Sequence, residues 1–124
     1  MSKEKFLIWG RAFELNVQYD CYEDEDILPA QKVAFAFFKG EADHILNSDQ
    51  EIKKYCFENN GAEIGEVIDN IFKYVIPVSI FVKRDEKKHV VAVMCNYKFD
   101  IEHGIALLFV NEKLVQIGSQ DIVS

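Results

Sequence analysis

The sequence lacks the residue patterns that mark most structural metal sites, dithiol redox sites and membrane spans. Its three cysteines, Cys21, Cys56 and Cys95, are isolated from one another, and no C-x-x-C pair occurs. This spacing supports neither a zinc knuckle nor a redox motif, and we expect small buried thiols. No apolar run approaches the roughly twenty residues that span a bilayer, and the N-terminus carries no signal-peptide core. We therefore expect a soluble, cytoplasmic protein that does not associate with membranes.

Positive charge is also scarce. The chain has 14 Lys and Arg against 21 Asp and Glu, a formal net charge of −7. The one basic cluster, KRDEKKH at 83–89, is interrupted by Asp85 and Glu86, so we interpret it as the solvated tip of a β-hairpin. A phosphate backbone would be repelled by this balance, which argues against nucleic-acid binding. An acidic surface suits a basic protein partner, and it equally serves plain solubility.

The length and patterning indicate a single α+β domain over residues 1–124. Apolar residues alternate from Phe13 to Cys21 after a short apolar run, which predicts an N-terminal β-hairpin. A helix is expected from Pro29 to Gly40, and a second over the segment DQEIKKYCFENN, closed by Asn60 and Gly61.

A third helix is predicted over 62–75. Its apolar side chains recur at helical spacing, and Pro77 would stop it; they are Ile64, Val67, Ile68, Ile71, Phe72 and Val75. The segment EADHIL, with His44, is expected to extend one of the first two helices.

After Pro77 the pattern changes to strands. The segments 77–84, 89–99, 105–110 and 114–118 are separated by short polar turns, which predicts an antiparallel four-strand meander. We expect two or three helices to pack on the single sheet that this meander forms. The last strand would leave an exposed edge that could recruit a partner by strand addition. The oligomeric state stays open, a dimer included.

One stretch, NYKFDIEHGIALLF at 96–109, gathers chemistry-bearing residues. Asp100, Glu102 and His103 are competent metal ligands, but no H-x-x-x-H motif accompanies them. Asp100 and Glu102 could also pair and raise the pKa of one carboxyl group, with Cys95 or Ser119 as distant nucleophiles. The favoured alternative is structural: Asp100 and His103 tie a strand corner, and Gly104 supplies positive φ. We expect no catalytic residue, metal or cofactor.

Four consecutive carboxylates, Glu23, Asp24, Glu25 and Asp26, form a second notable feature. They lack the spacing and the glycine of a calcium loop, so we expect a solvated acidic loop. It is also the favoured candidate for contact with a basic partner.

The C-terminal part of the chain resembles a group of small, uncharacterised bacterial domains. The likeness covers 74–124 and rests on a D-x-E-H-G corner, an apolar strand, a short hairpin and a closing I-G-x-x-D. The matching positions are Asp100, Glu102, His103, Gly104, Gly118 and Asp121. Several such families look like immunity proteins of bacterial toxin systems, which are small acidic proteins that neutralise a toxin by binding it.

The function expected from the sequence is therefore protein binding without catalysis, with a basic toxin domain as the partner that the resemblance implies. Two alternatives stay open. One is a small hydrolase or metal-dependent enzyme centred on the D-x-E-H corner. The other is a module that binds a small ligand in a pocket between the sheet and the helices.

Overall fold

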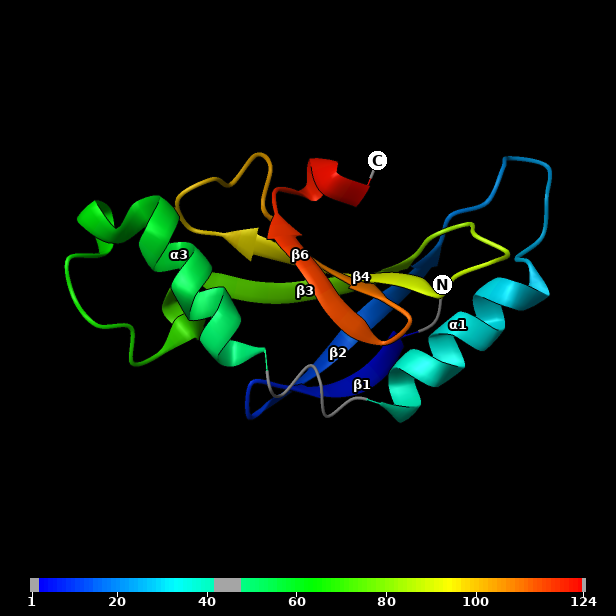
Figure 1. Ribbon diagram of the computed structural model, residues 1–124, viewed down its shortest axis with the longest axis horizontal. Helices are drawn as coiled ribbons and strands as arrows, with labels where there is room; N and C mark the ends of the chain where they lie inside the picture. The colour runs from blue at the N-terminus through cyan, green and yellow to red at the C-terminus, as the bar shows by residue number, and fades with distance from the viewer. Residues whose placement is uncertain (1–2, 42–47, 124) are drawn as a thin grey trace.

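A computed structural model describes residues 3–41 and 48–123 as an α+β arrangement with one six-stranded mixed sheet (Figure 1). The strands lie in chain order. Their bounds are β1 (Lys3–Ile8), β2 (Arg11–Tyr19), β3 (Val75–Val82), β4 (Val90–Tyr97), β5 (Ile105–Val110) and β6 (Lys113–Gly118). Two α-helices in the described part of the chain, α1 (Pro29–Gly40) and α3 (Asp49–Ile64), separate β2 from β3.

The N-terminal hairpin closes through a two-residue turn. Trp9 and Gly10 both take positive φ, 49° and 85°, which is the pattern of a type I′ turn between antiparallel strands. The alternation that continues through β2 places Leu15 and Val17 in the core, where they are at most 3 % exposed.

The predicted hairpin and meander are confirmed in part, because both form but neither is a separate unit. β3 to β6 pair antiparallel in chain order. β2 pairs parallel with β3, from Asn16 opposite Ser79 to Tyr19 opposite Val82. The long segment between these strands makes that parallel pairing accessible, since a crossover needs a dozen or more residues. The sheet is therefore mixed and continuous from β1 to β6.

The predicted third helix over 62–75 is wrong. α3 continues past Asn60, which has the non-helical φ of −137°, and ends at Gly65 in the left-handed conformation. After Gly65 the chain is irregular until a short 3-10 helix, η1 (Ile71–Lys73), in which the Asn70 side chain accepts a hydrogen bond from the Phe72 N–H. Ile64, Ile68 and Ile71 are still buried, at 8 % exposure or less. The helical spacing identified most of the residues that reach the core, but Val67 is 80 % exposed. Gly65, in the left-handed conformation, ends α3, so no helix carries the later residues there.

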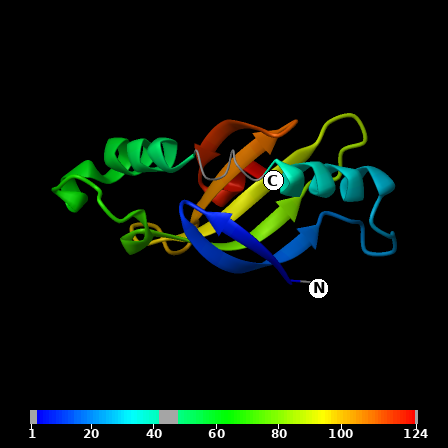
Figure 2. The ribbon, with the colours of Figure 1, turned by 90° about the horizontal axis from the view of Figure 1, so that it is seen from below.

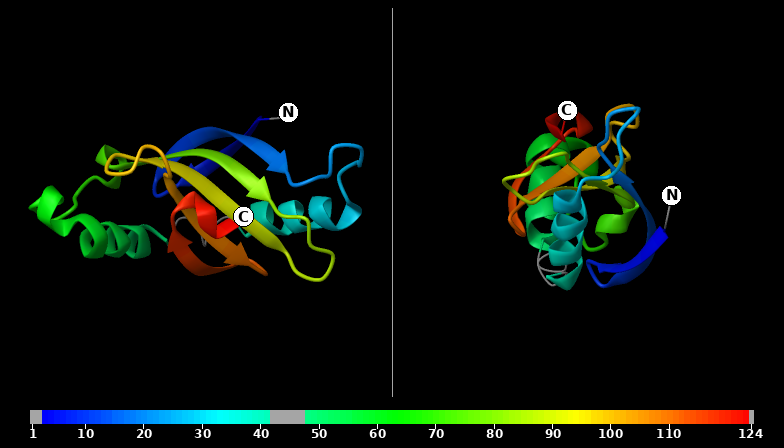
Figure 3. Two further views of the ribbon diagram at one scale, coloured as in Figure 1. Left: turned by 90° about the horizontal axis from the view of Figure 1, so that it is seen from above. Right: turned by 90° about the vertical axis from the view of Figure 1, so that its right-hand side faces the viewer.

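The two faces of the sheet are covered differently. The large apolar side chains of one face pack with α1 and α3 in the main core, which includes Phe38, Ile52, Leu107 and Phe109. Figures 2 and 3 show both helices on this side, α1 toward one end of the molecule and α3 toward the other. On the opposite face, a smaller cluster around Ala92 and Ala106 is covered by the C-terminal 3-10 helix η2 (Gln120–Val123).

Residues 42–47 lie outside the described residues, so the expectation that EADHIL, with His44, extends a helix stays a prediction.

Candidate functional site

The D-x-E-H-G corner follows β4 as a tight hydrogen-bonded loop. The Asp100 Oδ1 atom accepts hydrogen bonds from the backbone N–H of His103 at 3.1 Å and pairs with the His103 ring at Nδ1 at 3.0 Å. The backbone N–H of Gly104 donates to the Asp100 carbonyl at 2.8 Å. One side chain therefore closes the loop twice, and the main chain closes it a third time.

Gly104 sits where the corner meets the C-terminal helix. Its φ is +61°, and a Cβ at this position would lie 2.5 Å from the Cys95 carbonyl oxygen and 2.6 Å from Gln120 Nε2. Gln120 donates from Nε2 to the same Cys95 carbonyl at 3.2 Å, and its backbone N–H donates to the His103 carbonyl at 3.1 Å. The corner and η2 are thus bonded together through β4.

The corner's charges follow from these contacts. The backbone and side-chain hydrogen bonds from His103 hold the pKa of Asp100 below its ordinary value. The hydrogen bond and charge of Asp100 raise the pKa of His103, with a smaller contribution from the charge of Glu102. Both side chains are partly exposed to solvent, 48 % for His103 and 42 % for Asp100. The carboxylate pairing of Asp100 with Glu102, which would raise a carboxyl pKa, is not the arrangement found, because Asp100 pairs with His103 and its pKa is lowered.

The two nucleophiles considered from the sequence are differently placed. Cys95 is completely buried, and burial raises the pKa of its thiol, so the thiol stays protonated at neutral pH. Ser119 donates to the Asp121 carboxylate at 3.5 Å. Within residues 3–41 and 48–123, no group of three or more His, Cys, Asp or Glu side chains is placed to hold a metal ion.

The acidic loop connects β2 to α1 and contains the exposed side chains of Glu23, Asp24 and Asp26. Glu25 forms an ion pair with Arg84 at 2.5 Å. The Arg84 guanidinium also lies 4.7 Å from the centre of the Tyr22 ring, and Tyr22 is 65 % exposed. Arg84 thereby holds the loop from the outside through a carboxylate and an aromatic ring at once.

A buried glutamine holds the same loop from the inside. Gln31, in the first turn of α1, is 0 % exposed. Its Nε2 donates to the carbonyls of Asp20 at 2.9 Å and Val82 at 3.2 Å, and its Oε1 accepts from the Leu28 N–H at 2.9 Å. Both ends of the loop are thus bonded to one side chain, together with the end of β3.

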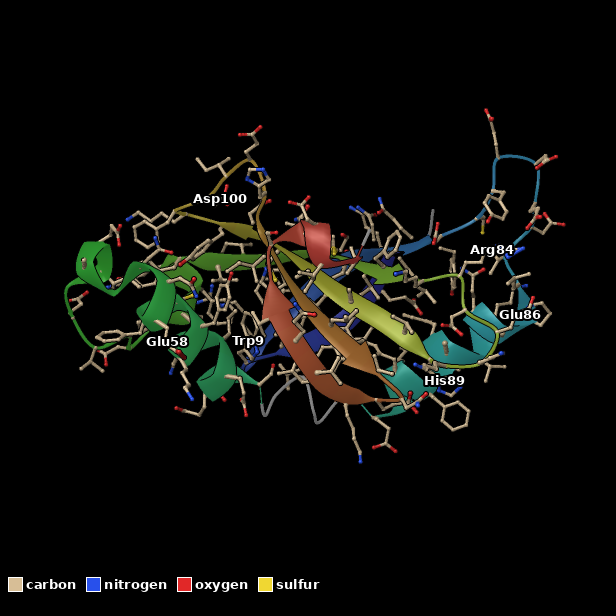
Figure 4. The ribbon with its side chains drawn as sticks, turned by 45° about the horizontal axis from the view of Figure 1, so that its top comes forward. Trp9, Glu58, Arg84, Glu86, His89 and Asp100 are labelled. Carbon is tan, nitrogen blue, oxygen red and sulfur yellow. The ribbon has the colours of Figure 1, made fainter. Side chains whose placement is uncertain are left out.

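The structure separates the two features that the sequence singles out. β2 and β3 are parallel, so the acidic loop leaves β2 beside the C-terminal end of β3. β4 runs antiparallel to β3, so the corner that follows it lies at the other end of the strands. Figure 4 shows Asp100 and Arg84 far apart for this reason. A joint site built from both features does not form.

Comparison with known protein families identifies the family of this chain. A family model described as a domain of unknown function (DUF6985) matches residues 2–124. The chain belongs to this family. No curated protein and no solved structure was found to match this chain. Within its described residues, this DUF6985 chain has no helix long and apolar enough to cross a membrane.

Sequence reasoning missed Gln31, Arg84 and Tyr22, the residues that shape the acidic loop. A glutamine three positions after a Ser or Thr cap indicates a helix start through a capping box. Here the cap is Leu28, which has no side-chain acceptor, so the sequence does not show that motif although Gln31 accepts from the Leu28 N–H. Arg84 was assigned to the solvated hairpin tip. The exposed turn lies just beyond Arg84, where the Asp85 carboxylate accepts from the N–H groups of Lys87 and Lys88 at 2.8 and 2.9 Å.

Proposed function

We propose that this protein is a non-enzymatic binding domain that holds a basic protein partner through the loop at 22–26. The observation that carries the proposal is the composition and anchoring of the loop. Exposed carboxylates follow the exposed Tyr22 on a segment that Gln31 and Arg84 bond to the scaffold. An aromatic ring inside a polar rim is the layout of many interface anchors.

The charges and the ring have different tasks in this mechanism. Glu23, Asp24 and Asp26 steer a basic surface toward the loop and raise the association rate. Tyr22 supplies contact area with little loss of side-chain freedom. Because the loop is already held in place, little conformational entropy is lost when the partner docks, and dissociation is slowed.

The finer proposal is that the partner is a bacterial toxin domain and that the protein is a cytoplasmic immunity protein. Binding alone would neutralise such a toxin, by covering a basic surface that the toxin needs. The acidic composition and the resemblance of 74–124 to immunity-protein-like domains support this identification.

Co-expression with the product of the gene next to this one tests the proposal. The wild-type chain should restore growth to cells arrested by that product and should co-purify with it. The variant E23K/D24K/D26K should lose both properties. The variant E63K/E66K/D69K makes the same change of charge at exposed positions around the C-terminal end of α3, and it should keep both.

Two results would count against the proposal. A neighbouring product that does not arrest growth removes the toxin identification. A product that binds both charge-reversal variants equally well removes the acidic loop as the interface.

A further inference from the structure

A groove of about 360 Å³ separates α3 from β6, the last strand of the sheet. Figure 1 shows α3 next to this edge of the sheet. The groove is distinct from the acidic loop, because the loop lies beside the end of β3 and α1.

The residues that line the groove define its direction. On α3 they are Glu51, Lys54, Tyr55, Glu58 and Asn59, the spacing of a single helix face. On β6 they are the four consecutive residues 114–117. Leu114 and Ile117 lie opposite Phe109 and Leu107 of the main core, whereas Gln116 lies opposite Leu108 on the other face of the sheet. Residues of both faces border the groove, so it runs along the strand's edge. The groove is therefore a channel between a helix face and a strand edge.

The edge itself is open to pairing. In the part of the chain that the structure describes, β5 is the only strand paired with β6. The register shifts between Leu108 and Phe109, which makes Val115 an extra, bulged residue on β6. A bulge and the terminal Lys113 both disfavour edge-to-edge pairing with a second copy. A short peptide strand has no sheet of its own to align, so neither feature excludes it from the edge.

The lining also indicates the chemistry of that peptide. Tyr55, Leu114 and Ile117 are partly buried and pack against the main core, so they form an apolar floor. Two carboxylates, Glu51 and Glu58, flank the single ammonium of Lys54 on the helix side. Figure 4 shows Glu58 on α3. A strand with apolar side chains toward the floor and basic side chains toward the helix would complement both walls.

We propose that this groove binds an extended, basic segment of a protein partner as a seventh strand on β6. The inference deepens the proposed function, since it rests on the same class of partner, but it uses a separate surface. Backbone hydrogen bonds to β6 supply the affinity, and the α3 carboxylates select the charge of the segment.

An eight-residue capped peptide that alternates lysine and valine tests the inference. Backbone NMR should show saturable shifts in 113–118 and on the groove face of α3. A peptide N-methylated at alternate residues should bind at least about tenfold more weakly, because it cannot complete the ladder of hydrogen bonds. The variant E51K/E58K should lose about tenfold in affinity, while the matched variant E63K/E66K should stay within about twofold.

Four outcomes would overturn the inference. They are the absence of saturable peptide binding, equal affinity for the N-methylated peptide, formation of a dimer through the β6 edge, and loss of peptide binding in E23K/D24K/D26K. Sedimentation experiments would detect the dimer. Loss of peptide binding in E23K/D24K/D26K would place the peptide on the acidic loop. Peptide binding that survives in E23K/D24K/D26K supports the groove even if the loop-dependent partner is never found, so failures of the two proposals are distinguishable.

Discussion

At Gly104 a single missing Cβ lets three parts of the chain meet. The Cys95 carbonyl and the Gln120 side chain both approach closer than any real Cβ would allow, and φ is +61°. We predict that Gly104→Ala lowers the free energy of unfolding by about 3 kcal/mol, from backbone strain and the clash together. Urea unfolding measures it.

Gly10→Ala is the matched control for this prediction. Gly10 also has positive φ, +85°, but a Cβ there would meet nothing within 4 Å. Only the backbone strain is then expected, about 1 kcal/mol. Equal costs for the two variants would show that the corner does not pack tightly against η2.

The Asp100–His103 pair predicts a pH signature. The hydrogen bond to Asp100 raises the pKa of His103. The stability that His103 contributes is therefore present at low pH and is lost as pH rises through that raised pKa. The pKa of Asp100 is lowered, so the stability that Asp100 contributes is present at higher pH and is lost as pH falls through that lowered pKa. The pair therefore contributes most between the two values.

NMR titration of the His103 ring measures this signature. Asp100→Asn should lower the pKa of His103 toward its ordinary value. Glu102→Gln should lower it less, because Glu102 acts on His103 through charge alone. An equal or larger fall in Glu102→Gln would contradict the assigned pairing.

At the scale of elements, Gln31 joins a helix, a loop and a strand. Gln31→Ala would leave the Leu28 N–H and the carbonyls of Asp20 and Val82 without the bonds they make to this side chain. We predict a loss of about 2–3 kcal/mol in the free energy of unfolding and faster amide exchange across 20–28.

Gln50→Ala, at an exposed position of α3, should change the free energy of unfolding by less than about 0.5 kcal/mol. If the two glutamine variants are equally stable, Gln31 does not hold the acidic loop.

Secondary structure was predictable where one local rule acted alone. The alternation in β2, Pro29 at the start of α1 and the short turns of the meander each indicated the element that forms. The 62–75 segment failed because two rules conflicted: apolar spacing favoured a helix, whereas Gly65 in the left-handed conformation ended one. The parallel pairing of β2 with β3 depends on contacts between residues more than sixty positions apart, which no local pattern reports.

The candidate site was predictable to a similar extent. The residue types of the corner suggested its turn, since Asp and Gly have well-known roles in turns. The bonds of Arg84 to Glu25 and of Gln31 to Val82 span 59 and 51 positions, and only the folded chain shows that they shape the acidic loop.

At the scale of the whole molecule, the acidic loop and the D-x-E-H-G corner are separate surfaces. The loop at 22–26 lies beside the end of β3, and the D-x-E-H-G corner lies beside the end of β4, at opposite ends of these strands. A partner bound at the loop would therefore leave the corner uncovered. We predict that Asp100→Asn leaves partner affinity unchanged within about twofold, measured by calorimetry; a larger loss would extend the interface to the corner.

The most direct measurement is the rate of association with the basic partner as a function of ionic strength. For the wild-type chain the rate should fall steeply with salt, and E23K/D24K/D26K should reduce it at least about tenfold at low salt. E63K/E66K/D69K, with the same change of net charge, should keep both the rate and its salt dependence within about twofold. Equal rates for the two variants would contradict the central claim, because net charge rather than the acidic loop would then govern binding.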